Sequence, residues 1–244
     1  MLSIDESPIT VIVPAAGIGS RMASSIPKQY LLLGNQTVLS HTLELLVSHP
    51  RVTSVIVALH PDDDKFSNLP IAQHSKIAQV VGGNERVDSV LNALATLPDD
   101  HWVMVHDAAR PCLTHHDIDQ LLETIVEAAQ TSSQQPLPCG AILAKPAIDT
   151  MKQIEPDSLT INTTIDREKL WHALTPQLFN SHTLRAAIER ALRLKLTLTD
   201  EASAMEYAGY HVKVIQGHAS NIKITMPEDL ALAEFYLTQQ GRLA

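Results

Sequence analysis

The sequence has 244 residues, of which 45% are hydrophobic and 18% are charged, and its formal net charge is −9. This is the composition of a folded globular chain, so we expect a single domain over residues 1–244 and exclude intrinsic disorder. The acidic balance also excludes a broad nucleic-acid-binding surface, which requires clustered lysine and arginine. Any phosphate that the chain binds must therefore lie in a local basic pocket.

The two cysteines, Cys112 and Cys139, lie far apart in the sequence and form no C-x-x-C pair. Neither a disulfide framework nor a zinc site is therefore indicated, and a reducing cytoplasm is the expected location. The first ten residues contain no basic segment followed by an apolar run, and no stretch approaches the roughly 18 to 20 apolar residues of a membrane span. We expect a chain that is not exported and does not bind a membrane.

Short runs of apolar, often β-branched residues alternate with helical patterns along the chain. The predicted strands are 9–13, 52–59, 77–81, 102–106, 141–143 and 211–215. Their continuous apolar character predicts burial on both faces of a sheet. Helices are predicted over 85–97, 117–130 and 182–194, with a last helix after Thr225. Asn84 is the expected N-cap of the first helix, and Thr225 with Glu228 is the expected capping box of the last.

This alternation of strand and helix predicts an α/β fold, with a mostly parallel twisted sheet, helices on both faces and ligands beyond the carboxyl ends of the strands. The alternation weakens over about 147–170, where polar residues and a proline are frequent. Such a segment is typical of a projecting β-arm. Because an arm has little of its own domain to pack on, we expect it to contact a partner subunit.

A glycine turn follows the first predicted strand directly, in the stretch VIVPAAGIGSRM, residues 11–22. Glycines at 17 and 19 let backbone N–H groups approach a phosphate. A dinucleotide-binding fingerprint requires a third glycine where Met22 stands, and no Gly-Lys-Ser/Thr follows as in a P-loop. What remains is a loop with two cations, Arg21 and Lys28, suited to the charge that develops when a nucleoside triphosphate is attacked at its α-phosphorus. Two solvated surface cations are the alternative.

Asp107 follows the apolar run 102–106, at the expected carboxyl edge of the sheet. A carboxylate in this place can orient a nucleotide hydroxyl or lie beside Mg²⁺, directly or through water. A helix or turn cap is the alternative, although Arg110 in the same turn favours a functional role. The twelve histidines include no H-E-x-x-H spacing, and we expect His106 to be structural.

Ordered blocks along the chain resemble nucleotidyltransferases that activate sugar phosphates. They are PAAGIGSRM (14–22), PKQY (27–30), GGNERVDSV (82–90), VHDAARPC (105–112), DTMK (149–152), TIDR (164–167), WHALTPQ (171–177), LTDEASAMEY (198–207) and NIKIT (221–225). Together they resemble the 2-C-methyl-D-erythritol 4-phosphate cytidylyltransferase family of the non-mevalonate isoprenoid pathway, from about Ile9 to Leu237. The resemblance implies a Rossmann-like nucleotide-diphospho-sugar transferase fold, a homodimer, Mg²⁺ as cofactor, and CTP and a polyol phosphate as substrates.

The resemblance also implies roles for individual residues. Arg21 and Lys28 would be catalytic, Arg167 and Lys223 would position substrate, and Asp107 would serve both CTP and the metal. The remaining CTP-binding residues would be Pro14, Ala15, Ala16, Gly17, Gly19, Gly83, Asn84 and Ser89, and the acceptor would bind Arg110, Thr150, Thr175 and Thr199. Thr199 is also an N-cap candidate for the following helix. Since Arg167 ends the predicted arm, we expect it to complete the partner subunit's site.

Three other functions compete with this one. The same chemistry on another polyol phosphate, such as ribitol 5-phosphate, would use a similar fold and first loop. A nucleotide-binding regulator without turnover is disfavoured by the presence of both loop cations and Asp107. An NAD-linked oxidoreductase is disfavoured by Met22 at the third glycine position.

Overall fold

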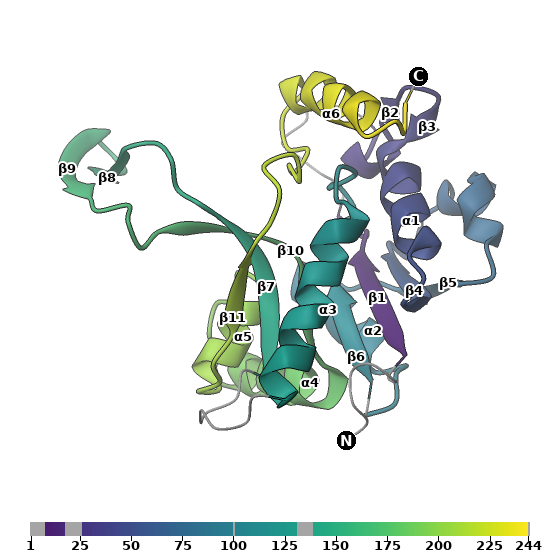
Figure 1. The fold of residues 1–244 in the computed structure, drawn as a ribbon, viewed down its shortest axis with the longest axis horizontal. Coiled ribbons are helices and arrows are strands. Elements are labelled where there is room, and N and C mark those ends of the chain that lie inside the picture. Colours follow the sequence, from purple (N-terminus) through teal and green to yellow (C-terminus); the bar gives the residue numbers. More distant parts are fainter. Residues whose placement is uncertain (1–7, 18–25, 100, 131–138, 244) are drawn as a thin grey trace.

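The computed structural model describes residues 8–17, 26–99, 101–130 and 139–243. Seven strands form one twisted sheet in the order β11-β7-β10-β6-β1-β4-β5 (Figure 1). The strands are β1 (Ile9–Pro14), β4 (Val52–Leu59), β5 (Ile77–Val81), β6 (Trp102–Val105), β7 (Gly140–Pro146), β10 (Trp171–Asn180) and β11 (Lys213–Gln216). All six strands that the apolar runs predicted are present, and the α/β fold is confirmed.

The strand β10 departs from the predicted pattern. It pairs antiparallel with both β6 and β7, whereas the pairs β1–β4, β1–β6, β4–β5 and β7–β11 are parallel. Its segment WHALTPQLFN contains a proline and several polar residues, so the apolar runs did not reveal it. Because β10 runs against its neighbours, its early residues lie at the edge of the sheet where β1 and β6 end.

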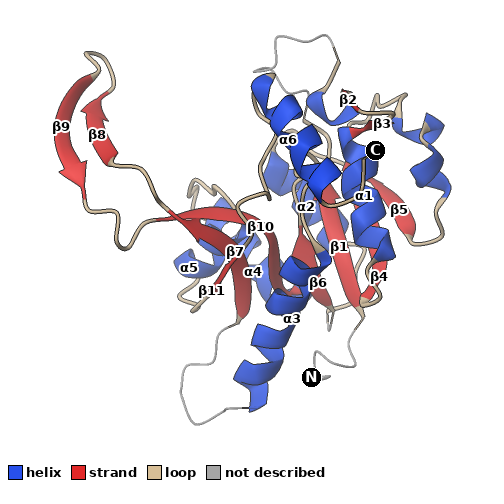
Figure 2. Cartoon of the chain, turned by 45° about the horizontal axis from the view of Figure 1, so that its top comes forward, coloured by secondary structure: helices blue, strands red, loops and turns tan. Residues whose placement is uncertain are grey.

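Helices cover both faces of the sheet, as predicted, and each face has its own apolar core (Figure 2). On one face α1 (Val38–Ser48) packs against β4 and α3 (His115–Gln130) packs against β7 and β10, and Leu39, Leu43 and Leu46 of α1 are fully buried. The other face carries α2 (Arg86–Leu94), α4 (Ser181–Arg193) and α5 (Glu201–Tyr207). Burial of each such leucine contributes about 1.5 to 3 kcal/mol, so the two layers hold the sheet's carboxyl edge in place.

A third, smaller core lies at the end of the molecule near the C-terminus. There α6 (Glu228–Gln239) buries Ala233 and Leu237 near the short strands β2 (Leu32–Leu33) and β3 (Gln36–Thr37). The predicted capping box of α6 is wrong. The Asp229 carboxylate, rather than that of Glu228, accepts the backbone N–H groups of Thr225 and Met226, and the Thr225 hydroxyl donates to the Lys223 carbonyl.

The predicted arm is present as an antiparallel hairpin, β8 (Met151–Glu155) with β9 (Thr160–Ile165), which projects from the body of the protein (Figure 1). Almost all of its residues are exposed. Exposed fractions are 42% for Ile154, 74% for Leu159 and 57% for Ile161, and Ile148 at the base of the hairpin is 75% exposed. The arm therefore presents an exposed apolar surface.

Two further expectations are wrong in detail. The outer strands β5 and β11 are not buried on both faces, since Val81 is 61% and Val214 is 46% exposed. The N-cap of α2 is Glu85, whose N–H donates to Asp88 Oδ2, and not Asn84. In the part of the chain that the structure describes, no helix is long and apolar enough to cross a membrane.

Candidate active site

Three loops meet at the edge of the sheet where the parallel strands β1, β5 and β6 end. Together with the 3-10 turn Lys28–Tyr30 and Lys223, they line one cavity, here called the first pocket. Its lining consists of Pro14, Ala15, Ala16, Gly17, Lys28, Gln29, Gly83, Asn84, Glu85, Arg86, Ser89, Asp107, Ala108, Ala109 and Lys223. Open α/β sheets bind ligands at this edge, so the cavity is the candidate nucleotide site.

The start of the glycine loop is held by a side chain that sequence reasoning missed. Gln29 is 5% exposed, and its Nε2 donates to the carbonyl oxygens of Ala15 at 2.8 Å and Gly17 at 3.1 Å. Two backbone acceptors are thereby satisfied, which fixes the loop as it leaves β1. Gly19 and Arg21 lie outside the described residues.

Glycine is required where the loop after β5 approaches the loop after β1. A Cβ at Gly82 would lie 2.5 Å from Ala16 Cβ, and a Cβ at Gly83 would lie 2.1 Å from Asp88 Cβ. Both contacts are far closer than carbon atoms tolerate, so Gly82 lets the two loops meet and Gly83 lets its loop pass close to α2. The Ser89 hydroxyl accepts the Gly83 N–H at 3.0 Å and fixes that loop to α2.

A second pocket adjoins the first on the side of β10 and α5. Its lining is Arg86, Asp107, Arg110, Ala173, Leu174, Thr175, Gln177, Thr199, Asp200 and Lys223. The two pockets share Arg86, Asp107 and Lys223. A ligand in one pocket can therefore meet a ligand in the other at these three side chains.

Asp107 stands among three cations. Its Oδ1 lies 3.2 Å from Arg86 Nε, and its Oδ2 lies 3.2 Å from Arg110 Nε and 3.0 Å from Lys223 Nζ. Burial alone would raise the pKa of this carboxyl, but Arg86, Lys223 and Arg110 together hold it far below its ordinary range. Asp107 is thus an anion at any physiological pH, and it orders the cations around it.

Arg86 makes the shortest ion pair among the described residues of the site, and it was not predicted. Its Nη1 and Nη2 donate to Oε1 and Oε2 of Glu201, at 2.5 Å and 3.1 Å. Burial alone would lower the pKa of the Arg86 guanidinium, but the carboxylates of Glu201 and Asp107 raise it above its ordinary value. Arg86 lies in the block GGNERVDSV and Glu201 in LTDEASAMEY, but no spacing in the sequence links them.

His106 is structural, as expected from the sequence. It is fully buried, its Nδ1 lies 3.0 Å from Thr175 Oγ1, and its Nε2 lies 3.2 Å from the Arg110 carbonyl. Burial lowers the pKa of His106 to about 4, so the ring is neutral near pH 7. A neutral ring that donates from Nε2 leaves Nδ1 to accept the Thr175 hydroxyl, which itself accepts the Asp107 N–H at 3.0 Å.

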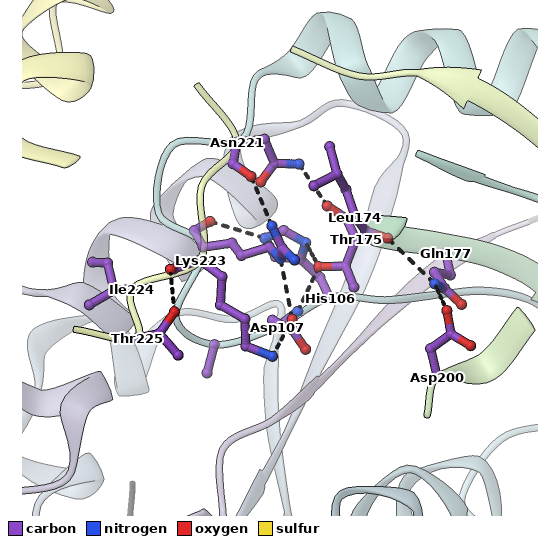
Figure 3. Close-up of polar contacts among 12 residues, drawn as sticks. His106, Asp107, Leu174, Thr175, Gln177, Asp200, Asn221, Lys223, Ile224 and Thr225 are labelled. Atoms are coloured by element: carbon purple, nitrogen blue, oxygen red, sulfur yellow. Dashed lines mark hydrogen bonds and ion pairs between the residues drawn. The ribbon is translucent and has the colours of Figure 1, made fainter. Parts of the chain in front are cut away.

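Residues 221–224, which follow β11, lie against the loop after β6 and the early part of β10 (Figure 3). Arg110 Nη1 donates to the Asn221 carbonyl and Asn221 Nδ2 donates to the Thr175 carbonyl, both at 2.8 Å. Lys223 follows and reaches Asp107, while Lys28 Nζ donates to the Ile224 carbonyl at 3.0 Å. The β6 loop, the early part of β10 and residues 221–224 therefore form one hydrogen-bonded unit.

Most of the predicted site residues meet at these two pockets. Lining the first are Pro14, Ala15, Ala16, Gly17, Lys28, Gly83, Asn84, Ser89, Asp107 and Lys223, and lining the second are Asp107, Arg110, Thr175, Thr199 and Lys223. Thr199 is not the N-cap of α5, because the Asp200 side chain accepts the Ser203 N–H. Thr150 and Arg167 lie at the base of the arm, outside both pockets, where Arg167 donates to the Ile148 carbonyl.

Comparison with known proteins agrees with this geometry. A family model for 2-C-methyl-D-erythritol 4-phosphate cytidylyltransferase matches residues 9–239. The protein of that name from Shewanella denitrificans is 56% identical over 226 residues, covering 93% of this chain and 90% of the relative. Its Escherichia coli counterpart is 52% identical over 231 residues, covering 95% of this chain and 94% of the relative.

Solved structures give the same result. The crystal structure of Francisella tularensis 2-C-methyl-D-erythritol 4-phosphate cytidylyltransferase superposes with a TM-score of 0.78 at 37% identity, covering 95% of this chain and 100% of that one. The Thermus thermophilus enzyme of that name gives a TM-score of 0.74 at 30% identity, covering 93% and 98%. The match runs through the whole sheet and both pockets, and the chain belongs to the 2-C-methyl-D-erythritol 4-phosphate cytidylyltransferase family.

Proposed function

We propose that the chain joins CTP to 2-C-methyl-D-erythritol 4-phosphate, giving 4-diphosphocytidyl-2-C-methyl-D-erythritol and pyrophosphate. A phosphate oxygen of the acceptor forms a bond to the α-phosphorus of CTP, and the bond from that phosphorus to the bridging oxygen of the β-phosphate breaks. One observation carries the proposal: two adjoining pockets share an anion, Asp107, surrounded by three cations. Two pockets with cations at their shared boundary can hold two phosphate-bearing substrates side by side.

CTP occupies the first pocket in this proposal. Its base and ribose lie against the loop that carries Gly83, Asn84 and Ser89, and its triphosphate lies along the loop after β1. Lys28 lines that pocket, and Arg21 of the same loop is the second cation. Both stabilise the negative charge that grows on the transferred phosphoryl and the leaving pyrophosphate.

The acceptor occupies the second pocket. Its phosphate is attracted by Lys223, whose side chain is 40% exposed, while Arg110 at 9% supports the pocket from below. The hydroxyl groups of Thr175 and Thr199 lie on the same wall. The phosphate is largely a dianion at neutral pH, so no residue need remove a proton from it. The neutral, buried His106 is consistent with this.

Mg²⁺ accompanies the triphosphate in this proposal. The described residues contain no group of three or more acidic, histidine or cysteine side chains that could hold a metal. The residues of the first pocket fit Mg²⁺ nonetheless, because this ion commonly takes one or two carboxylates and completes its coordination shell with substrate phosphates and water. Asp107 is the carboxylate shared by the two pockets and would hold it. The ion neutralises charge on the pyrophosphate when bound.

A homodimer completes the site through the arm. The exposed apolar side chains of the hairpin support an interface with a second copy of this chain, and Arg167 and Thr150 at its base would reach the partner's acceptor pocket. The two free cysteines support the reducing cytoplasm as the place of the reaction.

Nucleotide selectivity tests the proposal. The purified chain is incubated with Mg²⁺, methylerythritol phosphate and each of CTP, UTP, ATP and GTP in turn, and products are identified by phosphorus NMR. The diphosphate diester is expected with CTP. Its formation with another nucleotide and not with CTP would contradict the assignment of the first pocket.

A further inference from the structure

We propose that Arg86 is a positioning residue that fixes the Asp107 carboxylate between the two pockets, and that Glu201 fixes Arg86 in turn. The inference rests on the proposed function and deepens it, because it assigns a role in acceptor use to two residues outside the predicted site. Neither residue needs to touch a reacting atom.

All three nitrogens of the Arg86 guanidinium donate hydrogen bonds to protein carboxylates. Nη1 and Nη2 donate to the two oxygens of Glu201, and Nε donates to Asp107 Oδ1 at 3.2 Å. A bidentate pair of this kind fixes the plane of the guanidinium as well as its position. The edge that points to Asp107 is thereby oriented, and each of the three nitrogens of Arg86 has a carboxylate oxygen as a partner.

The three residues join elements that are distant in the sequence. Arg86 is the first residue of α2, Asp107 follows β6, and Glu201 is the first residue of α5. Exposed fractions are 2% for Glu201 and 7% for Asp107. Charges so deeply buried cannot relax into water, so changing one of them changes where the others lie.

The start of α5 is itself held rigidly. Gln177 Nε2 donates to Asp200 Oδ2 at 2.9 Å, and Gln177 Oε1 accepts the Ala202 N–H at 2.9 Å (Figure 3 shows Gln177 and Asp200). Glu201 lies between these two contacts, so the central strand β10 determines its position. The sheet therefore positions Glu201, Glu201 positions Arg86, and Arg86 positions Asp107.

The three cations are divided between the two oxygens of the Asp107 carboxylate. Arg86 pairs with Oδ1 of Asp107, which leaves Oδ2 to Arg110 and Lys223, the other two cations that line the second pocket. Glu201 also offsets the charge of Arg86, and Lys223 has the most exposed side chain of the three cations around Asp107. Without Glu201, Arg86 could move and compete with Arg110 and Lys223 for Asp107 and for the acceptor phosphate. The acceptor would then be held less precisely in the second pocket.

The test uses Glu201→Gln, which keeps the shape of the side chain and removes its charge, and Arg86→Lys, which keeps the charge and removes the fork. Steady-state pyrophosphate release gives kcat and KM for each substrate, and melting temperatures report folding. For both variants kcat/KM for the acceptor should fall about 10- to 100-fold while KM for CTP changes less than about 3-fold. Glu189→Gln, which breaks the exposed Arg185–Glu189 pair, is the matched control and should retain wild-type kinetics.

A double-mutant cycle separates positioning from general stabilisation. In an Asp107→Asn background, Glu201→Gln should change the residual kcat/KM by less than about 2-fold, because its effect is transmitted through Asp107. The same large loss in both backgrounds would overturn the inference. A folded Glu201→Gln variant with kcat/KM for the acceptor within about 2-fold of the wild type would also overturn it. A wild-type chain without any turnover would instead refute the proposed function, and this inference with it.

Discussion

The ammonium group of Lys223 lies 3.0 Å from Oδ2 of Asp107, in an ion pair that joins the segment after β11 to the loop after β6. Counting side-chain atoms alone, Asp107 is 9% and Lys223 is 40% exposed, so the pair presents its positive side to the pockets. An acceptor phosphate can displace the carboxylate as the partner of Lys223 without leaving Asp107 unpaired, because Arg86 and Arg110 remain.

Lys223→Gln should therefore weaken acceptor use. A hydrogen bond to a charged group contributes about 1.5 to 3 kcal/mol, so kcat/KM for methylerythritol phosphate should fall about 10- to 100-fold while KM for CTP changes little. Lys213→Gln, at an exposed position on β11, is the control. Equal acceptor kinetics for the two variants would exclude Lys223 from the acceptor site.

Lys28→Ala should reduce turnover far more than it weakens CTP binding. We expect a loss in kcat of about 100-fold or more, since the cation acts chiefly on charge that develops in the transition state. Calorimetric titration gives the Kd for CTP, which should change less than about 3-fold. Arg21→Ala should behave likewise, and Lys65→Ala on an exposed turn is the control. Weaker CTP binding with unchanged turnover would refute the catalytic role.

The protein should lose stability as the pH falls from 6.5 towards 4, in part because of His106. Its folded pKa of about 4 lies below the unfolded value of about 6.5, so the unfolded chain binds more protons across that window. The contribution lost between pH 7 and pH 5 is about 2 kcal/mol.

Urea unfolding of the wild type and of His106→Gln at both pH values measures that contribution. The stability of the variant should fall by about 2 kcal/mol less than that of the wild type. His41 and His49, whose pKa values burial also lowers, contribute equally to both proteins and cancel in the comparison. The same pH dependence in the two proteins would show that His106 is not buried in its neutral form.

Mixed dimers test the arm. If Arg167 completes the partner's site, an Arg167→Ala chain and an Arg21→Ala chain should each be inactive alone. Mixed dimers should regain activity, because one of their two sites has both arginines intact. The two chains are refolded together with distinguishable tags and the mixed species is purified. Mixed dimers as inactive as the parents would mean that the site is not shared.

Local patterns were enough to predict much of the fold. The apolar runs predicted six strands of the sheet, because strands in a sheet that helices cover carry successive apolar residues that pack into the cores on its two faces. They did not give β10, whose Thr175 and Gln177 are buried polar residues with partners elsewhere in the chain. A strand that serves the site carries polar residues, and so it loses the pattern by which a strand is recognised.

The loops of the site could be predicted, but the network beneath them could not. Glycine and charge after a strand indicate a phosphate site from local sequence alone. The pair Arg86–Glu201 depends on α2 and α5 meeting across 115 residues, and only the fold brings them together. Gln29 could have been suspected from its place between Lys28 and Tyr30, yet its partners are backbone carbonyls that no motif reveals.

The central claim is tested most directly by pyrophosphate release with CTP and Mg²⁺ and two alternative acceptors. The account predicts one pyrophosphate per methylerythritol phosphate consumed, and a kcat/KM far below that value with ribitol 5-phosphate. No release with methylerythritol phosphate, or faster release with ribitol 5-phosphate, would contradict it.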